Sequence, residues 1–151
     1  MITRILAAVD DSPAALMAAR AAIELAVPLG ARVRAVNVLR DGALGDTFEA
    51  VAGGTRVHER RSVAAAAVLG HVAGLARRSG VEVETCQLHG DPARRILAEA
   101  RTWHADLVVI GRSEQERRAG APYVGGETAH VLEFAERPVL VVPPSAPAGG
   151  A

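Results

Sequence analysis

Residues 5–39 read ILAAVDDSPAALMAARAAIELAVPLGARVRAVNVL, and the spacing of the apolar residues changes twice within them. The apolar run from Ile2 to Val9 predicts a strand. The residues after Pro13 repeat at the spacing of a helix, with apolar positions at Leu16, Ala19, Ile23 and Ala26. From Ala31 to Leu39 the pattern predicts a second strand. The stretch therefore indicates a strand, a helix and a strand in succession.

The two ends of this helix carry local signals. Asp11 or Ser12 is the expected N-cap, because a short polar side chain there accepts a hydrogen bond from a free amide of the first turn. Pro13 suits the first helical position, where no amide hydrogen is needed. Pro28 together with Gly30 predicts the end of the helix.

The same alternation continues along the chain. Helices are expected at 57–79, 92–104 and 127–136, and strands at 81–88, 105–110 and 138–142. Residues 40–55 are rich in glycine and lack clear periodicity, which predicts a mobile connection. Strands that alternate with helices indicate an α/β fold, a parallel sheet with helices on both faces. Ligands bind beyond the carboxyl ends of such strands, which selects the loops that hold Asp10 and Gly111.

Composition argues against several classes of function. A chain of 151 residues suits one domain with its own core. Seventeen basic and seventeen acidic residues cancel, so the charge expected of a protein that binds nucleic acid or an anionic membrane is missing. No apolar run is long enough to span a membrane, and the first residues read as a strand and not as a signal peptide. The single cysteine, Cys86, forms no internal disulfide, which fits a reducing cytoplasm.

Residues 111–128 read GRSEQERRAGAPYVGGET and lie between the fourth predicted strand and the last predicted helix. A glycine directly after a buried strand and a glycine pair at a helix start shape the backbone to accept phosphate. The residues between these glycines include Glu114 and Glu116, whose charge is unfavourable beside a phosphate. The stretch therefore predicts either a nucleotide site or the remains of one.

Other chemistry finds less support. The five histidines, at positions 58, 71, 89, 104 and 130, share no spacing typical of metal ligands. Ser113 and His130 are near each other in the sequence, but no third residue completes a nucleophilic triad. We therefore expect no metal site and no catalytic residues, which favours a non-enzymatic function.

Three stretches together resemble the universal stress protein family. Residues 5–39 resemble its opening, where a first strand ends in Val-Asp-x-Ser-Pro and a helix follows. Residues 90–111, GDPARRILAEARTWHADLVVIG, are similar to its third helix and fourth strand, and residues 129–143, AHVLEFAERPVLVVP, to its closing helix and strand. The resemblance implies one Rossmann-like domain over residues 1–143, with five parallel strands in the order 3-2-1-4-5. Residues 144–151 have too few apolar groups to fold and are expected to form a disordered tail.

Members of this family pair through their fifth strands, so the resemblance also implies a homodimer. The sequence supports this independently, because residues 138–142 would form an edge strand with unpaired backbone groups. The flanking prolines blunt that edge only in part. The expected contact is the segment from Val139 to Val142.

Nucleotide-binding members carry Gly-x2-Gly-x9-Gly-Ser/Thr after the fourth strand, and this chain departs from that motif. Gly111 matches the first glycine and Gly126 the last, but Glu114 takes the place of the second. Glu127 stands where a hydroxyl would donate to phosphate, and fourteen residues separate Gly111 from Gly126, two more than in the motif. A carboxylate, like a phosphate, is favourable at a helix N-terminus, so Glu127 is a candidate to fill the site itself. Alternatively, Gly120 or Gly125 takes over part of a displaced motif.

Several residues nevertheless match the family's binding positions. The resemblance implies that Asp10 contacts adenine and that Val38 packs near the ribose and base. Arg112, Arg117 and Arg118 are candidates to meet phosphates. The candidate binding residues are Asp10, Val38, Gly111, Arg112, Gly125, Gly126, Glu127 and Thr128. Structural roles compete with these assignments, since Asp10 also suits a cap of the first helix and Val38 is an ordinary strand residue.

The resulting hypothesis is a cytoplasmic universal stress protein that acts as a homodimer. Its function would be non-enzymatic, as a stress-response module that docks an unidentified protein partner and binds neither nucleic acid nor membrane. In this reading the nucleotide motif is degraded. One alternative is a regulatory switch in which ATP, with Mg²⁺, orders residues 111–126. Another is slow ATP hydrolysis.

Overall fold

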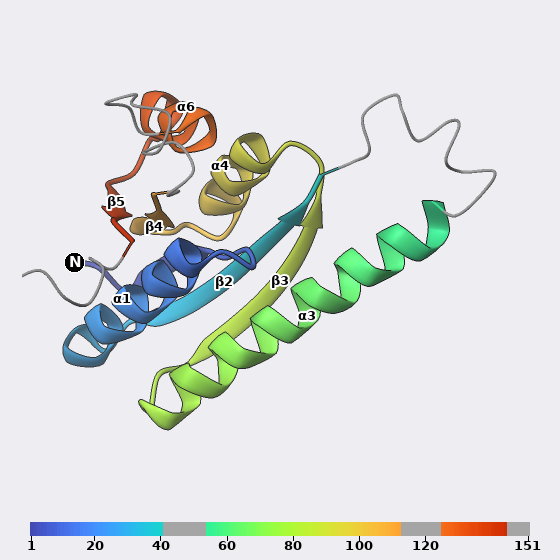
Figure 1. The fold of residues 1–151 in the computed structure, drawn as a ribbon. Helices are drawn as coiled ribbons and strands as arrows, with labels where there is room; N and C mark the ends of the chain where they lie inside the picture. Colours follow the sequence, from blue (N-terminus) through green and yellow to red (C-terminus); the bar gives the residue numbers. More distant parts are fainter. Residues whose placement is uncertain (41–53, 113–124, 145–151) are drawn as a thin grey trace, which may run out of the picture.

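The computed structural model describes residues 1–40, 54–112 and 125–144. The strands are β1 (Arg4–Ala8), β2 (Arg32–Leu39), β3 (Val83–His89), β4 (Leu107–Gly111) and β5 (Val139–Val142). The helices are α1 (Pro13–Leu29), α3 (Gly54–Arg78), α4 (Pro92–Thr102) and α6 (Gly126–Phe134). The strands form one parallel sheet in the order β3-β2-β1-β4-β5 (Figure 1). The fold class and the strand order expected from the sequence are thus confirmed.

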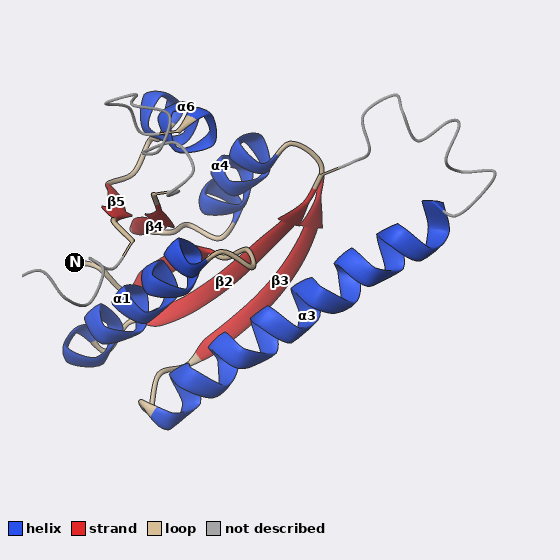
Figure 2. Ribbon diagram, in the orientation of Figure 1, coloured by secondary structure: helices blue, strands red, loops and turns tan. Residues whose placement is uncertain are grey.

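Helices cover both faces of the sheet (Figure 2). On one face α1 and α3 pack against residues such as Ile5 and Val33, and on the other α4 and α6 pack around Leu6 and Val36. Because neighbouring residues of a strand point to opposite faces, a strand covered twice is apolar throughout. The buried side of α1 is mostly alanine, which lets the helix lie close to the sheet; these alanines are Ala14, Ala15, Ala18, Ala19, Ala22 and Ala26.

Both ends of α1 lie where the sequence predicts them. Ser12 is the N-cap, and its Oγ accepts a hydrogen bond from the Ala15 amide at 3.1 Å. Pro13 takes the first helical position. Pro28, in contrast, lies within the last turn and does not end the helix. The helix ends where Gly30 adopts a φ of 61°, a conformation that glycine takes without steric penalty.

The other helices lie close to their expected positions. Asp91 caps α4, with its Oδ1 accepting from the Arg94 amide at 2.9 Å, and α4 ends two residues before His104. Most of the predicted mobile connection, residues 41–53, and most of the predicted tail, residues 145–151, lie outside the described residues. Among the helices that the structure describes, none combines the length and apolar character needed to cross a bilayer.

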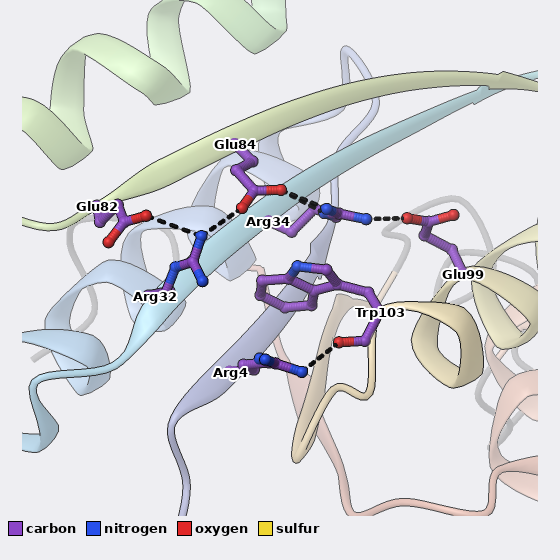
Figure 3. A network of polar contacts seen from close by, with 7 residues as sticks. All are labelled: Arg4, Arg32, Arg34, Glu82, Glu84, Glu99 and Trp103. Atoms are coloured by element: carbon purple, nitrogen blue, oxygen red, sulfur yellow. Dashed lines mark hydrogen bonds and ion pairs between the residues drawn. The ribbon is translucent and has the colours of Figure 1, made fainter.

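Charged side chains join β2, β3 and α4 on one face of the sheet (Figure 3). Arg34 of β2 forms ion pairs with Glu84 of β3 and Glu99 of α4, and its guanidinium lies 4.8 Å from the centroid of the Trp103 ring. Arg32 lies beside this group, with its Nη2 2.7 Å from Oε1 of Glu84. The hydrogen bond from Arg34 is the main cause of a lowered pKa at Glu84. These contacts tie the edge strand β3 to the interior of the domain.

Strand β5 forms the opposite edge of the sheet, and within the described ranges it pairs with β4 alone. The carbonyl groups of Pro138 and Val142 accept hydrogen bonds from the β4 side. Because backbone groups of alternate residues point to the same side of a strand, those of Val139 and Val141 point away from the sheet. The predicted contact with a second chain would use these groups, and it stays a prediction.

Candidate functional site

A cleft of about 990 Å³ opens at the carboxyl ends of β1, β2 and β4. Its walls also include the starts of α1, α4 and α6 and one side of α3. A parallel sheet of this order is expected to bind ligands there, and the volume suits a ligand the size of a nucleotide. The predicted site residues that line the cleft are Asp10, Val38, Gly111, Gly126, Glu127 and Thr128.

Asp10 lies at the end of β1 and is exposed at the wall of the cleft. Its Oδ1 accepts a hydrogen bond from the Ser12 amide at 2.8 Å. The alternative that Asp10 caps the first helix is therefore wrong, since Ser12 does so and Asp10 closes the turn before it. Asp11 lines the same wall, so this side of the cleft carries two carboxylates.

Strand β2 contributes one predicted residue and one that the sequence analysis overlooked. Val38 is half-buried and offers the cleft an apolar surface. Asn37 is 6% exposed, and its Nδ2 donates to the Val9 carbonyl at 2.8 Å. This bond clamps the end of β2 to the end of β1 beneath the cleft. The sequence signal for Asn37 was one polar side chain among the apolar residues at the end of β2.

Gly111 ends β4 directly beneath the first turn of α1. A side-chain carbon at this position would lie 2.5 Å from the carbonyl oxygen of Ala14 and 2.9 Å from the Ala15 amide nitrogen. Real contacts of that kind are never so short, so packing alone requires glycine here. The match of Gly111 to a phosphate motif therefore has a purely structural explanation as well.

The start of α6 differs from the sequence-based expectation by one residue. Gly125 is the N-cap, without a side-chain hydrogen bond, and the helix begins at Gly126 instead of Glu127. The first amides of a helix have no acceptor within it, so those of residues 126–128 are available to an anion. Thr128 is buried and lines the cleft, which places a hydroxyl in the first turn although Glu127 occupies the motif position.

Two arginines complete the cleft, and the sequence analysis assigned neither. Arg40 directly follows β2 and forms an ion pair with Glu127 of α6. Arg61 lines the cleft from α3. Nothing near Arg40 in the sequence points to Glu127, because the two residues meet only through the folding of the sheet. The one available signal was that Arg40 comes directly after a strand whose carboxyl end faces the predicted site.

The remaining candidates lie elsewhere. Arg112 is not among the residues that line the cleft; its amide donates to the Val142 carbonyl at 2.8 Å, and its contact with phosphate stays a prediction. Glu114, Arg117 and Arg118 lie outside the described residues. His130 packs on Phe134 with ring centroids 4.8 Å apart. In the described parts of the chain, no three histidine, cysteine or acidic side chains are grouped so that they could share a metal ion.

Solved structures with the same fold are numerous, and three illustrate the likeness. The universal stress protein UspA from Lactobacillus plantarum is 25% identical, with a TM-score of 0.80 over 93% of this chain and 97% of its own. The universal stress protein from Archaeoglobus fulgidus in complex with dAMP is 23% identical, with a TM-score of 0.67 over 94% and 98%. A universal stress protein family protein from Arabidopsis thaliana with AMP bound is 17% identical, with a TM-score of 0.69 over 99% and 96%.

Sequence comparison gives a result of its own. No curated protein is similar enough in sequence to count as a relative. The profile of the universal stress protein family, however, matches residues 1–143, nearly the whole chain. That match agrees with the strand order, the Val-Asp-x-Ser-Pro turn and the position of the cleft. The chain belongs to the universal stress protein family.

Proposed function

We propose that this protein binds an adenine nucleotide in the cleft and acts without catalysis, as a stress-response binding module in the cytoplasm. The observation that carries the proposal is the composition of the cleft wall. It combines Asp10 and Val38 with Thr128 and the free amides of α6. Asp10 and Val38 suit a base, and the amides with Thr128 suit an anion, which is the combination that a nucleotide requires.

Two relatives of the same fold hold dAMP and AMP, and this supports the choice of ligand class. In the proposed complex the base lies by Val38 and Asp10, as the family resemblance implies. The phosphate lies by Gly126 and Thr128, where a missing side chain leaves room and amides are available. If Mg²⁺ accompanies a polyphosphate, it would take most of its ligands from phosphate and water.

The absence of catalysis is proposed from the kind of residues at hand. The described part of the cleft wall holds neither histidine nor cysteine, and the carboxylates of Asp10 and Glu127 are held by the Ser12 amide and by Arg40. The module would therefore act through a partner protein that recognises the domain or its dimer. We propose a homodimer joined by the outer edge of β5, whose backbone groups at Val139 and Val141 point away from the sheet.

A second candidate is a docking module that binds no nucleotide. The ion pair between Arg40 and Glu127 favours it, because a carboxylate of the protein already holds an arginine of the cleft. In that case residues 111–126 would serve only as part of a protein-binding surface.

Calorimetric titration of AMP and of ATP with Mg²⁺ separates the two candidates. We expect binding in the micromolar range, weakened at least tenfold in Asp10→Ala. Asp10→Asn keeps an acceptor for the Ser12 amide and so tests the charge without loosening the turn. Glu24→Ala, on the exposed side of α1, is the control for a remote acidic residue. No heat, no shift in melting temperature and no nucleotide released on denaturation would favour the docking module.

A further inference from the structure

The two walls of the cleft carry opposite charges. Asp10 and Asp11 stand on the β1–α1 side, whereas Arg40 and Arg61 stand on the β2–α3 side. A phosphate chain that leaves the start of α6 is repelled by the first pair and attracted by the second. The distribution of charge therefore gives an anionic ligand one favourable direction, toward the arginines.

An acidic group of the protein already occupies that direction. Glu127, at the second position of α6, forms an ion pair with Arg40. Both side chains are largely exposed, at 51% for Glu127 and 63% for Arg40. Exposed ion pairs contribute little to stability, so a ligand can exchange with the carboxylate at a small cost.

Phosphate is the group best suited to make that exchange. It carries more charge than a carboxylate and offers several oxygens to the planar donor groups of an arginine. A monophosphate bound at the amides of α6 occupies only that position and does not reach the two arginines. A second or third phosphate has the extra charge and the extra length to replace Glu127 at Arg40 and to approach Arg61.

We propose that Arg40 and Arg61 form a second anion site, that Glu127 occupies it in the free protein, and that the site makes the cleft selective for nucleoside di- and triphosphates over monophosphates. This inference rests on the proposed function, because it concerns the same cleft. It adds Arg40 and Arg61, which come from the β2–α3 side and not from the glycine motif, and it assigns Glu127 the role of an internal competitor.

The test is titration of adenosine, AMP, ADP and ATP into the wild-type chain and Glu127→Gln, with the ratio of ATP to adenosine affinity as the readout. We expect this ratio to rise about three- to tenfold in Glu127→Gln and to fall in Arg40→Gln. The rise should shrink with added salt. Glu133→Gln is the matched control, because it removes an exposed carboxylate from the same helix away from the cleft.

The double variant Arg40→Gln/Glu127→Gln separates competition from simple repulsion. If Glu127 competes for Arg40, its replacement brings no gain once Arg40 is absent. A gain of equal size in both backgrounds, or an equal gain for AMP and ATP, would overturn the proposal.

Inorganic tripolyphosphate keeps this proposal distinguishable from the proposed function. In one outcome, tripolyphosphate binds Glu127→Gln more tightly than it binds the double variant, and adenosine and AMP do not bind. This outcome supports the anion site and refutes nucleotide binding. Nucleotides that bind all variants alike support nucleotide binding and refute the anion site. If neither probe binds any variant, both proposals are wrong.

Discussion

At the scale of single residues, Gly111 and Gly126 look alike in the sequence and differ in the structure. A side chain at Gly111 would collide with the backbone of α1, whereas one at Gly126 would meet no atom of the described residues within 4 Å. The first glycine is thus required by the packing of a helix on a strand. The second leaves open space at the mouth of the cleft, which is what a glycine reserved for a ligand would do.

Gly111→Ala should lower the free energy of unfolding by about 1 to 3 kcal/mol, because the added carbon must push α1 away from β4. Gly70→Ala is the control. Gly70 lies within α3 with open space around it, so alanine there should be neutral or stabilise the helix by about 1 kcal/mol. Urea unfolding of both variants measures the difference. Equal stabilities would contradict the packing argument for Gly111.

Asp106 should give the domain a measurable dependence on pH. Its carboxylate accepts from the Thr3 amide at 2.8 Å, the main cause of its lowered pKa, and from the Arg4 amide at 3.0 Å. A lowered pKa in the folded state stabilises the protein above the ordinary carboxyl pKa, and this stabilisation is lost as the pH falls through the folded value.

Asp106→Asn should therefore lower the free energy of unfolding by about 1 kcal/mol at neutral pH. The difference from the wild type should shrink as the pH falls below about 4. Denaturant titrations across this range provide the measurement, with the exposed Asp11→Asn as control. A difference that stayed constant with pH would show that charge is not the cause.

At the scale of elements, the sequence predicts best those helix boundaries that carry a local capping signal. Ser12 before Pro13 and Asp91 before Pro92 are local signals, and both act as caps in the structure. Gly30 ends α1 as predicted, whereas Pro28 lies inside the last turn and lacks the amide hydrogen that would bond to the carbonyl four residues earlier. The sequence offers no capping signal for α3, and that helix begins at Gly54, three residues before its expected start at 57.

The group of charges around Arg34 should stabilise the attachment of α4 to β2. Glu99 is only 14% exposed, so Glu99→Gln should lower the free energy of unfolding by about 1 to 2 kcal/mol. Glu82 pairs with Arg32 at 2.8 Å but is 65% exposed, and Glu82→Gln should change the stability by about 0.5 kcal/mol or less. Thermal and urea unfolding compare the two. An equal loss of stability in Glu82→Gln and Glu99→Gln would show that burial of the ion pair is not what stabilises this attachment.

At the scale of the whole molecule, the alternation of strands and helices was sufficient to predict a parallel sheet and the end at which its cleft lies. The composition of that cleft was predictable only where a family motif supplied positions, as for Asp10 and Val38. Glu127 was predicted, but its ion pair with Arg40 was not, because that contact spans the sheet and leaves no local pattern. Asn37 escaped notice because its bond to Val9 depends on strand pairing.

The proposed homodimer predicts a concentration-dependent assembly that depends on the outer edge of β5. Val141→Pro removes an amide that points away from the sheet, so it should shift sedimentation toward the monomer while the circular dichroism spectrum keeps its α/β shape. The control is Val63→Thr, at an exposed position of α3, which should leave the assembly unchanged. A wild-type chain that sediments as a monomer at high concentration would contradict the dimer.

The open space at Gly126 also offers a place for a spectroscopic reporter. The only native thiol, Cys86, is half-buried, and desolvation raises its pKa, which slows its reaction with labelling reagents. A cysteine introduced at position 126 in a Cys86→Ser background would be the single labelling site, at the mouth of the cleft. The fluorescence of an environment-sensitive dye at this position would report the binding of a ligand in the cleft.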